Sequence, residues 1–278
     1  MAVDGPDNPC IAHHALAIMK IGFALNEILA LLTLLTGGLS LAWWYLRRHG
    51  RTRKPWWVGW GAELFTVVAL IFSCRVALAD WQRVPTGSME PTLRVGDMLL
   101  INHLAYGPRL PFTNTALPLG QPQRGDVAVF RYPLDVSTFY VKRIVAVAGD
   151  RVEFRDGIVA INGQPTQVSD LGWGEHPADR GQRLLVERVA GREHAIKLNP
   201  FVLGRLPQSI GAPDCVEQRP GTWECTVPQG KLLAMGDNRD NSADSRSWGF
   251  LDEREVYGRV DRVLFNYLEF SRFWHKPA

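Results

Sequence analysis

The apolar positions divide the chain into two parts with different patterns. Residues 28–46 form an uninterrupted apolar run without a charged side chain. The hydrocarbon core of a bilayer is about 30 Å thick and is crossed by about 20 helical residues, so this run is long enough to span it. Trp43, Trp44 and Tyr45 close the run, where an aromatic belt is expected at the membrane interface. The pattern predicts a first transmembrane helix.

A second apolar run covers residues 56–79 and begins with Trp56 and Trp57. Glu63 and Arg75 lie toward its ends, where long side chains can reach the polar interface. We interpret this run as a second transmembrane helix. The alternative for both runs is a buried helix of a soluble protein, but their length and flanking tryptophans favour the membrane.

After residue 80 the pattern changes to short apolar runs separated by turn residues. Residues 94–102, 124–130 and 139–148 read as strands, and Asp156–Gly157 lies between two short runs, which is a strong hairpin signal. Long helical periodicity does not occur in this part of the sequence. We therefore expect an all-β domain anchored by the two helices.

These patterns predict an organisation in seven segments, with residues 164–230 as an inserted β-rich lobe because they are polar and interrupted by Gly and Pro. The segments are an N-terminal segment (1–27), a first span (28–46), a basic loop (47–55), a second span (56–79), a first part of the core (80–163), the lobe (164–230) and a second part of the core (231–278).

Charge supports a membrane topology rather than a nucleic-acid partner. The 278 residues carry a net charge of only +3, but five Arg and Lys residues lie within 47–55. Short basic loops stay in the cytoplasm, which predicts that everything after residue 80 is extracytoplasmic. A cleaved signal peptide is disfavoured, because the first run is too long and its basic cluster follows the run instead of preceding it.

The cysteines are compatible with an oxidising compartment. Cys215 and Cys225 flank a segment with Pro220–Gly221, a turn signal, at its middle. A hairpin there would bring the two sulfurs together, and we expect a disulfide between them. Cys74 falls in the second span and is interpreted as a small apolar residue. The Cys and His spacing does not indicate a zinc site.

Two residues are candidates for catalysis. Ser88 lies in VPTGSMEPTL (84–93), a turn bounded by Gly and Pro that can expose its hydroxyl, although turn serines are common. Lys142 lies in an apolar run, on the strand face of Tyr140 and Ile144. Burial of a lysine lowers its pKa, and a neutral amine can take the proton of a serine hydroxyl. The alternative for Lys142 is an edge strand on which the side chain faces solvent.

Other catalytic arrangements have little support. The histidines after residue 80 (His103, His176, His194 and His275) lie in no context typical of a serine–histidine pair. The chain has no G-x-S-x-G elbow, no H-E-x-x-H motif and no Gly-rich phosphate loop. A third polar segment, GDNRDNSADSRSWG (236–249), is dense in both charges, which indicates an ordered network of turns and Asp–Arg pairs.

Taken together, these segments resemble the bacterial type I signal peptidases, a serine–lysine protease family. VPTGSMEPTL is similar to the serine motif of that family, RGDVAVFRYP (124–133) to a following strand, YVKRIVAVAGD (140–150) to the lysine motif and the 236–249 segment to the last motif. The resemblance covers most of residues 60–265 and implies a β fold shared with self-cleaving repressors.

The resemblance implies a role for each matching position. Ser88 is expected to be the nucleophile, Lys142 the general base and Ser242 the hydroxyl that orients the lysine. The backbone N–H of Ser88 and the hydroxyl of Thr86, where many relatives have Ser, would form the oxyanion hole. A supporting network would comprise Arg143, Asp237, Arg239, Asp244 and Arg246, and the substrate pockets would be lined by Val84, Met89, Leu93, Tyr140, Val141 and Ile144.

The implied activity is removal of signal peptides from secretory preproteins after small residues, without metal or cofactor. The expected surroundings are the lipid of the bacterial inner membrane, with the catalytic domain on its periplasmic side, and possible contact with the translocation machinery. A peptidase dedicated to one export or conjugation substrate is the alternative. A non-catalytic assembly factor would lack the Ser or the Lys, and a self-cleaving repressor would need a DNA-binding segment instead of two spans.

Overall fold

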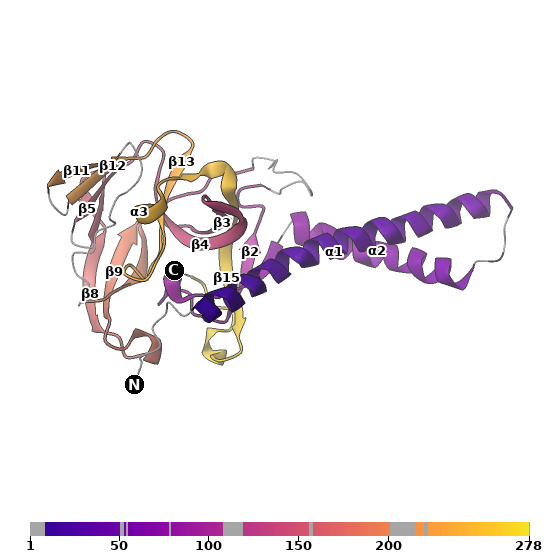
Figure 1. Cartoon of the computed structure of the whole chain (residues 1–278), viewed down its shortest axis with the longest axis horizontal. Helices are drawn as coiled ribbons and strands as arrows, with labels where there is room; N and C mark the ends of the chain where they lie inside the picture. The colour runs from indigo at the N-terminus through magenta and orange to yellow at the C-terminus, as the bar shows by residue number, and fades with distance from the viewer. Residues whose placement is uncertain are drawn as a thin grey trace.

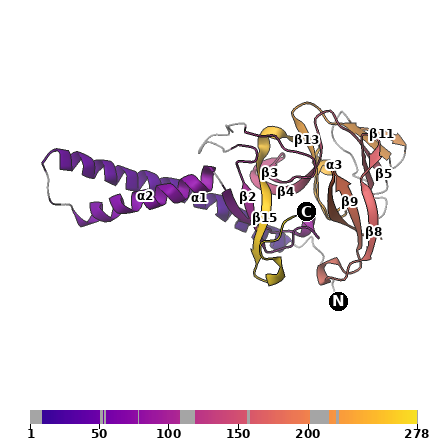
Figure 2. The ribbon, with the colours of Figure 1, turned by 180° about the vertical axis from the view of Figure 1, so that it is seen from behind.

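Two helices and a β-rich body make up the computed structural model of the chain (Figure 1). The structure describes residues 9–50, 53, 55–77, 79–107, 119–155, 158–200, 215–219 and 222–277, and their side chains from Ile28 onward except those of residues 57, 62, 76, 77, 217 and 219. Helix α1 covers Pro9–Arg48 and α2 covers Trp56–Ala77. They lie side by side, and the part of α1 that runs along α2 extends with it away from the strands, whereas the beginning of α1 lies at the β body (Figure 2).

Helix α1 contains the first predicted span, and α2 covers the second, predicted at 56–79, except for its end, because Ala79 belongs to β1. The stretches Ile28–Arg48 and Val58–Arg75 are long and apolar enough to cross a membrane. Helix α1 begins well before residue 28, so it includes most of the segment 1–27 that the sequence pattern placed ahead of the first span. Residues 1–8 of that segment, and 51, 52 and 54 of the basic loop, lie outside the described residues. Arg75, near the end of α2, pairs with Asp80 at 2.7 Å.

The described strands form three antiparallel sheets, which confirms the mainly β fold expected for the body. The largest sheet has the order β1-β2-β15-β3-β4-β13-β14. Its strands are β1 (Ala79–Arg83), β2 (Asp97–Asn102), β3 (Val127–Tyr132), β4 (Asp135–Val147), β13 (Lys231–Met235), β14 (Leu251–Asp252) and β15 (Val256–Asn266).

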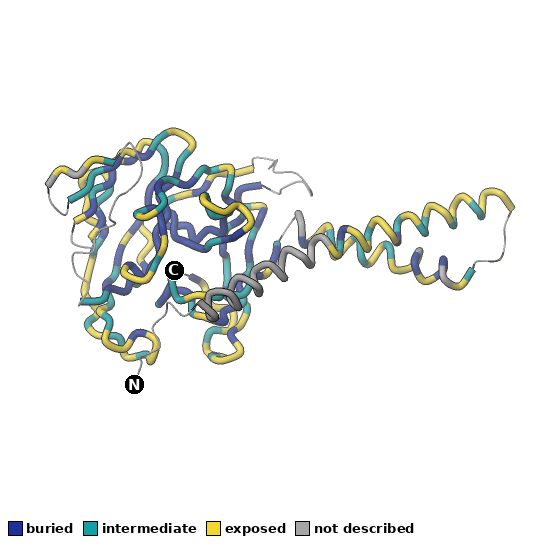
Figure 3. The backbone as a smooth tube through the Cα atoms, in the orientation of Figure 1, coloured by how far each residue is buried: buried dark blue, intermediate teal, exposed yellow. Residues whose placement is uncertain are grey.

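Alternation along the strands of this sheet builds apolar clusters on both of its faces. In β3, Val127 and Val129 pack into one cluster with Met89. Ala128 and Phe130 point the other way and pack into a second cluster, on the opposite face. A sheet covered on both sides reads as a continuous apolar run, which is why these strands are so uniformly hydrophobic. The body is accordingly buried at its centre, whereas the helix pair is largely exposed at its described side chains, from Ile28 onward (Figure 3).

The lobe consists of the two smaller sheets. One has the order β11-β12-β5-β6-β7 and the other β10-β9-β8. The strands are β5 (Arg151–Arg155), β6 (Ile158–Ile161), β7 (Gln164–Pro165), β8 (Gln167–Trp173), β9 (Arg183–Val189), β10 (Arg192–Leu198), β11 (Cys215–Arg219) and β12 (Thr222–Thr226).

The boundary predicted between residues 163 and 164 falls inside the first of these sheets. Strand β12 pairs with β5 along its length, from Thr222 opposite Arg155 to Thr226 opposite Arg151. The lobe therefore includes strands that the sequence pattern assigned to the core. The turns predicted at Asp156–Gly157 and at Pro220–Gly221 lie outside the described residues, although the strands on either side of each turn do pair.

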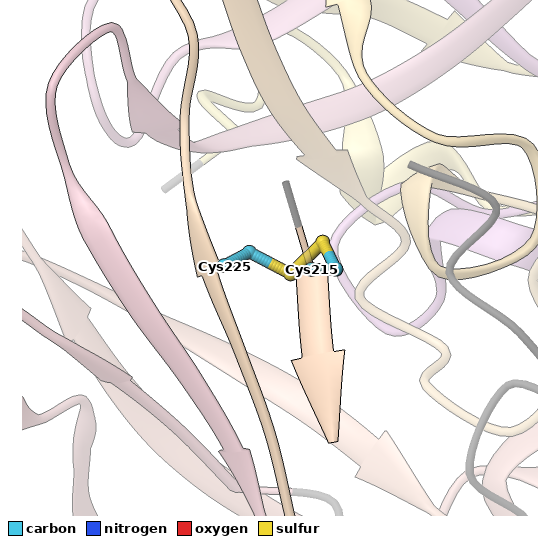
Figure 4. Close-up of a disulfide and its surroundings, with 2 residues drawn as sticks. All are labelled: Cys215 and Cys225. Carbon is cyan, nitrogen blue, oxygen red and sulfur yellow. A yellow bond between two sulfur atoms is a disulfide. The ribbon is translucent and has the colours of Figure 1, made fainter. Parts of the chain in front are cut away.

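A disulfide joins two strands of the lobe. Cys215 and Cys225 are opposite each other in the register of β11 and β12, and their sulfurs are bonded at 1.97 Å (Figure 4). The bond lies against an apolar cluster that includes Val145 and Met235 of the large sheet. Short helical turns complete the fold: η1 (Gly87–Met89), η2 (Pro177–Asp179), α3 (Ser245–Trp248), η3 (Glu253–Glu255) and η4 (Phe270–Arg272).

Candidate functional site

Ser88 lies in the short turn η1 between β1 and β2, and its side chain is half-buried. The residues on either side of the turn, Thr86 and Glu90, have extended backbones, so the turn stands out as a single 3₁₀ element. Met89 anchors it, because its side chain is only 1% exposed and packs into an apolar cluster with Leu93. The buried methionine thus holds the turn in place while the serine hydroxyl stays free to make a polar contact.

Lys142 meets Ser88 directly. It lies near the middle of β4, opposite Ala128 of β3, and is 3% exposed. Its Nζ donates a hydrogen bond of 2.6 Å to Oγ of Ser88. The same ammonium lies 5.3 Å from the centre of the Tyr140 ring, on the strand face expected from alternation. An edge-strand lysine facing solvent, the alternative interpretation, is therefore wrong.

Burial changes the acid–base behaviour of this amine. Desolvation lowers the pKa of Lys142 to about 8, while the nearby carboxylates of Asp244 and Asp237 act in the opposite direction and Arg246 lowers it further. A buried ammonium loses its hydration, which favours the neutral form. At neutral pH a usable fraction of such an amine is deprotonated, as a general base requires.

The two acids near the lysine are each neutralised by an arginine. Arg143 donates two hydrogen bonds to Asp237, at 2.9 and 2.7 Å, and Asp237 also accepts one from Thr92 at 2.5 Å. Arg246 pairs with Asp244 in the same two-point manner, at 2.8 and 2.7 Å. Burial by itself would raise the pKa of each carboxyl, but the paired arginine holds it below its ordinary value.

Asp244 also shapes the backbone beside the site. It caps α3 by accepting from the N–H of Arg246, and it accepts a hydrogen bond of 3.0 Å from the N–H of Gly236. Arg239 is the remaining residue of the predicted network. It pairs with Glu187 of the lobe and not with an acid of its own segment. The structure thus brings Asp237, Asp244 and Arg246 near the lysine, with Arg143 paired to Asp237, whereas Arg239 reaches the lobe.

The predicted oxyanion donor lies next to the serine. Thr86 Oγ1 donates to Ser88 Oγ at 3.5 Å, and the contact is exposed to solvent. A hydroxyl at this position can turn toward an oxygen bound at the serine. Its role in an oxyanion hole stays a prediction.

Ser242 is close to the site but does not contact the lysine through a hydrogen bond. Its Oγ is buried and has no hydrogen-bond partner among the described residues. A Cβ on Gly236 would lie 2.2 Å from Ser242 Oγ and 2.5 Å from the carbonyl oxygen of Ser88, so all three groups crowd one point. The orienting role predicted for Ser242 stays a prediction.

The residues predicted to line substrate pockets fall into two groups in the structure. Tyr140 is half-buried and Ile144 is fully buried, and both pack into the same apolar cluster. The other four belong to the cluster on the opposite face of the sheet: Val84, Met89, Leu93 and Val141. Their contribution to substrate specificity stays a prediction.

The structure adds contacts that the sequence did not indicate. The backbone N–H of Asn238 donates to the carbonyl of Ser88 at 3.1 Å, and its side-chain amide donates to the carbonyl of Gly87 at 2.9 Å. Asn238 belongs to the polar segment 236–249, but the sequence around an asparagine in a turn does not indicate which group it will bind. Among the described residues, no three His, Cys, Asp or Glu side chains are grouped in a way that could hold a metal ion.

Comparison with known proteins agrees with this arrangement. A family model described as signal peptidase, peptidase S26, matches residues 57–265. Signal peptidase I of Pseudomonas aeruginosa is 35% identical over 228 residues, which are 77% of this chain and 75% of that protein. Signal peptidase I of Pseudomonas fluorescens is 38% identical over 81% of this chain and 78% of its own length, and that of Aquifex aeolicus is 33% identical over 73% and 82%.

A crystal structure of a signal peptidase I from Enterococcus faecalis is more distant, with 23% identity, coverage of 50% of this chain and 97% of that one, and a TM-score of 0.29. Fold and site define a mainly β protein in which a serine hydroxyl meets a buried lysine amine. The sequence matches make the class specific: the chain belongs to the signal peptidase family, peptidase S26, and is a serine endopeptidase.

Proposed function

We propose that this protein removes signal peptides from secretory preproteins, cutting after small residues in an Ala-x-Ala pattern, with Ser88 as nucleophile and Lys142 as general base. The observation that carries the proposal is the 2.6 Å contact between Lys142 Nζ and Ser88 Oγ inside a buried polar network. Relatives that bear the name signal peptidase I over about three quarters of the chain support the substrate class.

The reaction follows from the position of these two groups. In its neutral form Lys142 accepts the proton of the Ser88 hydroxyl, so the hydrogen bond between them reverses its direction. The serine oxygen then attacks the scissile carbonyl, and the lysine passes the proton to the departing amine. An ester on Ser88 remains until water, deprotonated by the same lysine, releases the signal peptide and restores the serine.

When the serine attacks, negative charge develops on the oxygen of the scissile carbonyl, and hydrogen-bond donors must stabilise it. We assign the backbone N–H of Ser88 and the hydroxyl of Thr86, which lies 3.5 Å from Ser88 Oγ. One such donor lowers the barrier by roughly 3–4 kcal/mol. The Asp–Arg pairs of the supporting network do not take part in proton transfer; they neutralise the acids beside Lys142 so that the amine can lose its charge.

Membrane attachment completes the proposal. The spans within α1 and α2 anchor the chain, the basic loop 47–55 lies in the cytoplasm and the catalytic domain lies on the extracytoplasmic side. The partners are then membrane lipid and preproteins leaving the bilayer, with the translocation machinery close by. The site operates without metal or cofactor in this proposal, because every proton transfer uses Lys142.

Cleavage of a purified preprotein by the full-length protein in lipid vesicles tests the dyad. Ser88→Ala and Lys142→Ala are each expected to reduce turnover by more than about 10⁴-fold, as for other serine-peptidase nucleophiles and bases. Ser169→Ala and Lys231→Ala are matched controls away from the site and are expected to keep normal turnover. Near-normal activity of either dyad variant would disprove the mechanism.

The same assay separates a general from a dedicated enzyme. Several unrelated preproteins with Ala-x-Ala sites should all be cleaved at the predicted bond. Cleavage of only one of them would favour a peptidase dedicated to a single export substrate.

A further inference from the structure

The β9–β10 hairpin of the lobe carries buried charge that the proposed reaction does not use. Glu187 is fully buried, His194 is 2% exposed and Lys197 is 3% exposed. Charged side chains rarely lie inside a protein unless they are paired. Each of these residues faces the segment 237–239 or the serine turn of the core, so the lobe and the catalytic core share a polar interface.

Lys197 makes the most complete set of contacts at this interface. Its Nζ donates to Glu90 Oε2 at 2.7 Å, to the carbonyl of Ala178 at 2.9 Å and to Asp179 Oδ1 at 3.3 Å. An ammonium has three donors, and here all three have acceptors. Asp179 is further paired with Arg94 at 2.7 Å, and Arg94 also lies 3.9 Å from Glu269.

Glu90 ends the turn that holds Ser88. Its backbone N–H donates to the carbonyl of Gly87 at 3.1 Å, which closes the turn. Its carboxyl carbon lies 3.0 Å from the point where a Cβ on Gly87 would be, so the side chain folds back beneath the turn. A contact that fixes Glu90 therefore fixes the end of the serine turn.

The main chain of Lys197 holds the other side of the same turn. Its N–H donates to the carbonyl of Asp237 at 2.8 Å, and its carbonyl accepts from the N–H of Arg239 at 2.9 Å. Between these two residues lies Asn238, which donates to the carbonyls of Gly87 and Ser88. One lobe residue thus supports the serine turn through Glu90 and, by its backbone, through Asn238.

We propose that Lys197 is a positioning residue of the peptidase site, which holds the Ser88 turn at the distance where the serine hydroxyl meets Lys142. This inference rests on the proposed function and assigns the lobe a part in it. The reason is geometric, because a shift of the Ser88 turn would lengthen the 2.6 Å hydrogen bond between Lys142 Nζ and Ser88 Oγ. A displacement of about 1 Å at a reacting group can cost about 10²-fold in rate.

Lys197→Met tests the side-chain contacts, since methionine keeps most of the length of the side chain and leaves the backbone hydrogen bonds in place. The full-length protein in vesicles, acting on a purified Ala-x-Ala preprotein, is expected to lose about 10- to 100-fold in kcat, with KM changed less than about threefold. Lys231→Met is the matched control, because Lys231 pairs with Asp252 at 3.2 Å on a different edge of the large sheet. It is expected to keep normal kcat.

Two further measurements separate positioning from loss of stability. Glu90→Gln keeps the shape of the partner and weakens the ion pair, and it is expected to lower kcat on its own. The double variant Glu90→Gln/Lys197→Met should lose no more kcat than the more impaired single variant. The reason is that both substitutions break the same contact, the ion pair between Lys197 and Glu90. Circular dichroism and thermal melting report the folded fraction, and kcat is expressed per folded molecule.

Several outcomes would overturn the inference. One is a folded Lys197→Met protein whose kcat lies within about twofold of Lys231→Met, and another is losses that multiply in the double variant. If Lys197→Met does not fold, an unchanged kcat of Glu90→Gln overturns it. Ser88→Ala in the same assay keeps the two claims apart: near-normal turnover in that variant would refute the proposed function, whereas a Ser88→Ala protein that has lost more than about 10⁴-fold beside a normal Lys197→Met would refute only the role of Lys197.

Discussion

Lys142 is a buried cation that, among the described residues, has no carboxylate of its own. The acids that act on it, Asp237 and Asp244, are already paired with Arg143 and Arg246. Burying a charge is costly unless it is paired, and the cost appears here as the low pKa of the lysine. The protonated lysine therefore lowers the stability of the fold, and the same burial provides an amine that can lose its proton near neutral pH.

Removing this amine should make the protein more stable. The pKa of Lys142 is about 8 in the folded protein, against 10.5 for a lysine exposed to water. Between these values the unfolded chain binds more protons, so stability rises with pH, and below pH 8 the penalty is fully present. Lys142→Met is expected to raise the free energy of unfolding at pH 7 by up to about 3 kcal/mol. The gain should disappear toward pH 10.5.

Urea unfolding of the full-length protein in detergent at several pH values measures this difference. Lys231→Met, whose lysine is partly exposed, serves as the control and should show little change. A Lys142→Met protein that is less stable than the parent at pH 7 would contradict the argument.

Thr86 offers a second test at the scale of single residues. Thr86→Val keeps the shape of the side chain and removes its donor, and it is expected to reduce kcat by about 10²–10³-fold if the hydroxyl stabilises the oxyanion. Thr86→Ser keeps the donor and should retain most of the activity. Equal kcat for the Val and Ser variants, measured with the same preprotein, would exclude this role.

At the scale of elements, the end of β13 passes very close to the serine turn. Gly236 follows β13 directly, and a Cβ there would lie 2.5 Å from the carbonyl oxygen of Ser88 and 2.2 Å from Ser242 Oγ. The serine carbonyl belongs to the backbone and cannot rotate away. Only glycine allows the strand and the turn to approach this closely, because it has no Cβ.

Gly236→Ala should therefore move the turn away from Lys142. We expect a loss of activity on the order of 10²-fold from this displacement, with the sheets still formed. Gly38→Ala is the matched control, because nothing lies within 4 Å of the added methyl, and it should be fully active. Preprotein cleavage measures the activity, and circular dichroism measures whether the sheets still form. Normal activity of Gly236→Ala would show that the turn accommodates the methyl group without moving away from Lys142.

At the scale of the whole molecule, the helix pair and the β body expose different surfaces. Leu34 and Leu41 of α1 are both 68% exposed, and Trp56 of α2 is 79% exposed. The largest sheet buries its apolar residues on both faces instead. Such a continuous apolar surface on paired helices is expected to face lipid.

Cysteine labelling tests the proposed orientation. Cys10 and Cys74 are first replaced by serine, and a single cysteine is then introduced as His49→Cys in the basic loop or as Ser169→Cys on β8, both of which are exposed positions. A maleimide that does not cross membranes should label Ser169→Cys on intact spheroplasts and His49→Cys only after lysis. The reverse pattern would invert the topology.

Local patterns were sufficient for the class of fold and for the candidate pair. The two long apolar helices could be predicted because an uninterrupted apolar run of that length stands out in the sequence. Alternation assigned Lys142 to the face of Tyr140, where the structure places it. The sequence pattern could not predict which distant strands pair. It therefore placed β5 and β6 in the core, although they form one sheet with β12.

By itself, then, the sequence determined a mainly β architecture preceded by two long apolar helices, and it singled out Ser88 and Lys142 as unusual residues of their segments. Only the tertiary structure decided that the two side chains meet, although they are 54 residues apart, and that Asn238 and Lys197 support the turn that carries the serine. The reason is physical: the side on which a residue projects depends on its neighbours in the chain, whereas its contacts depend on the order of strands in the folded sheets.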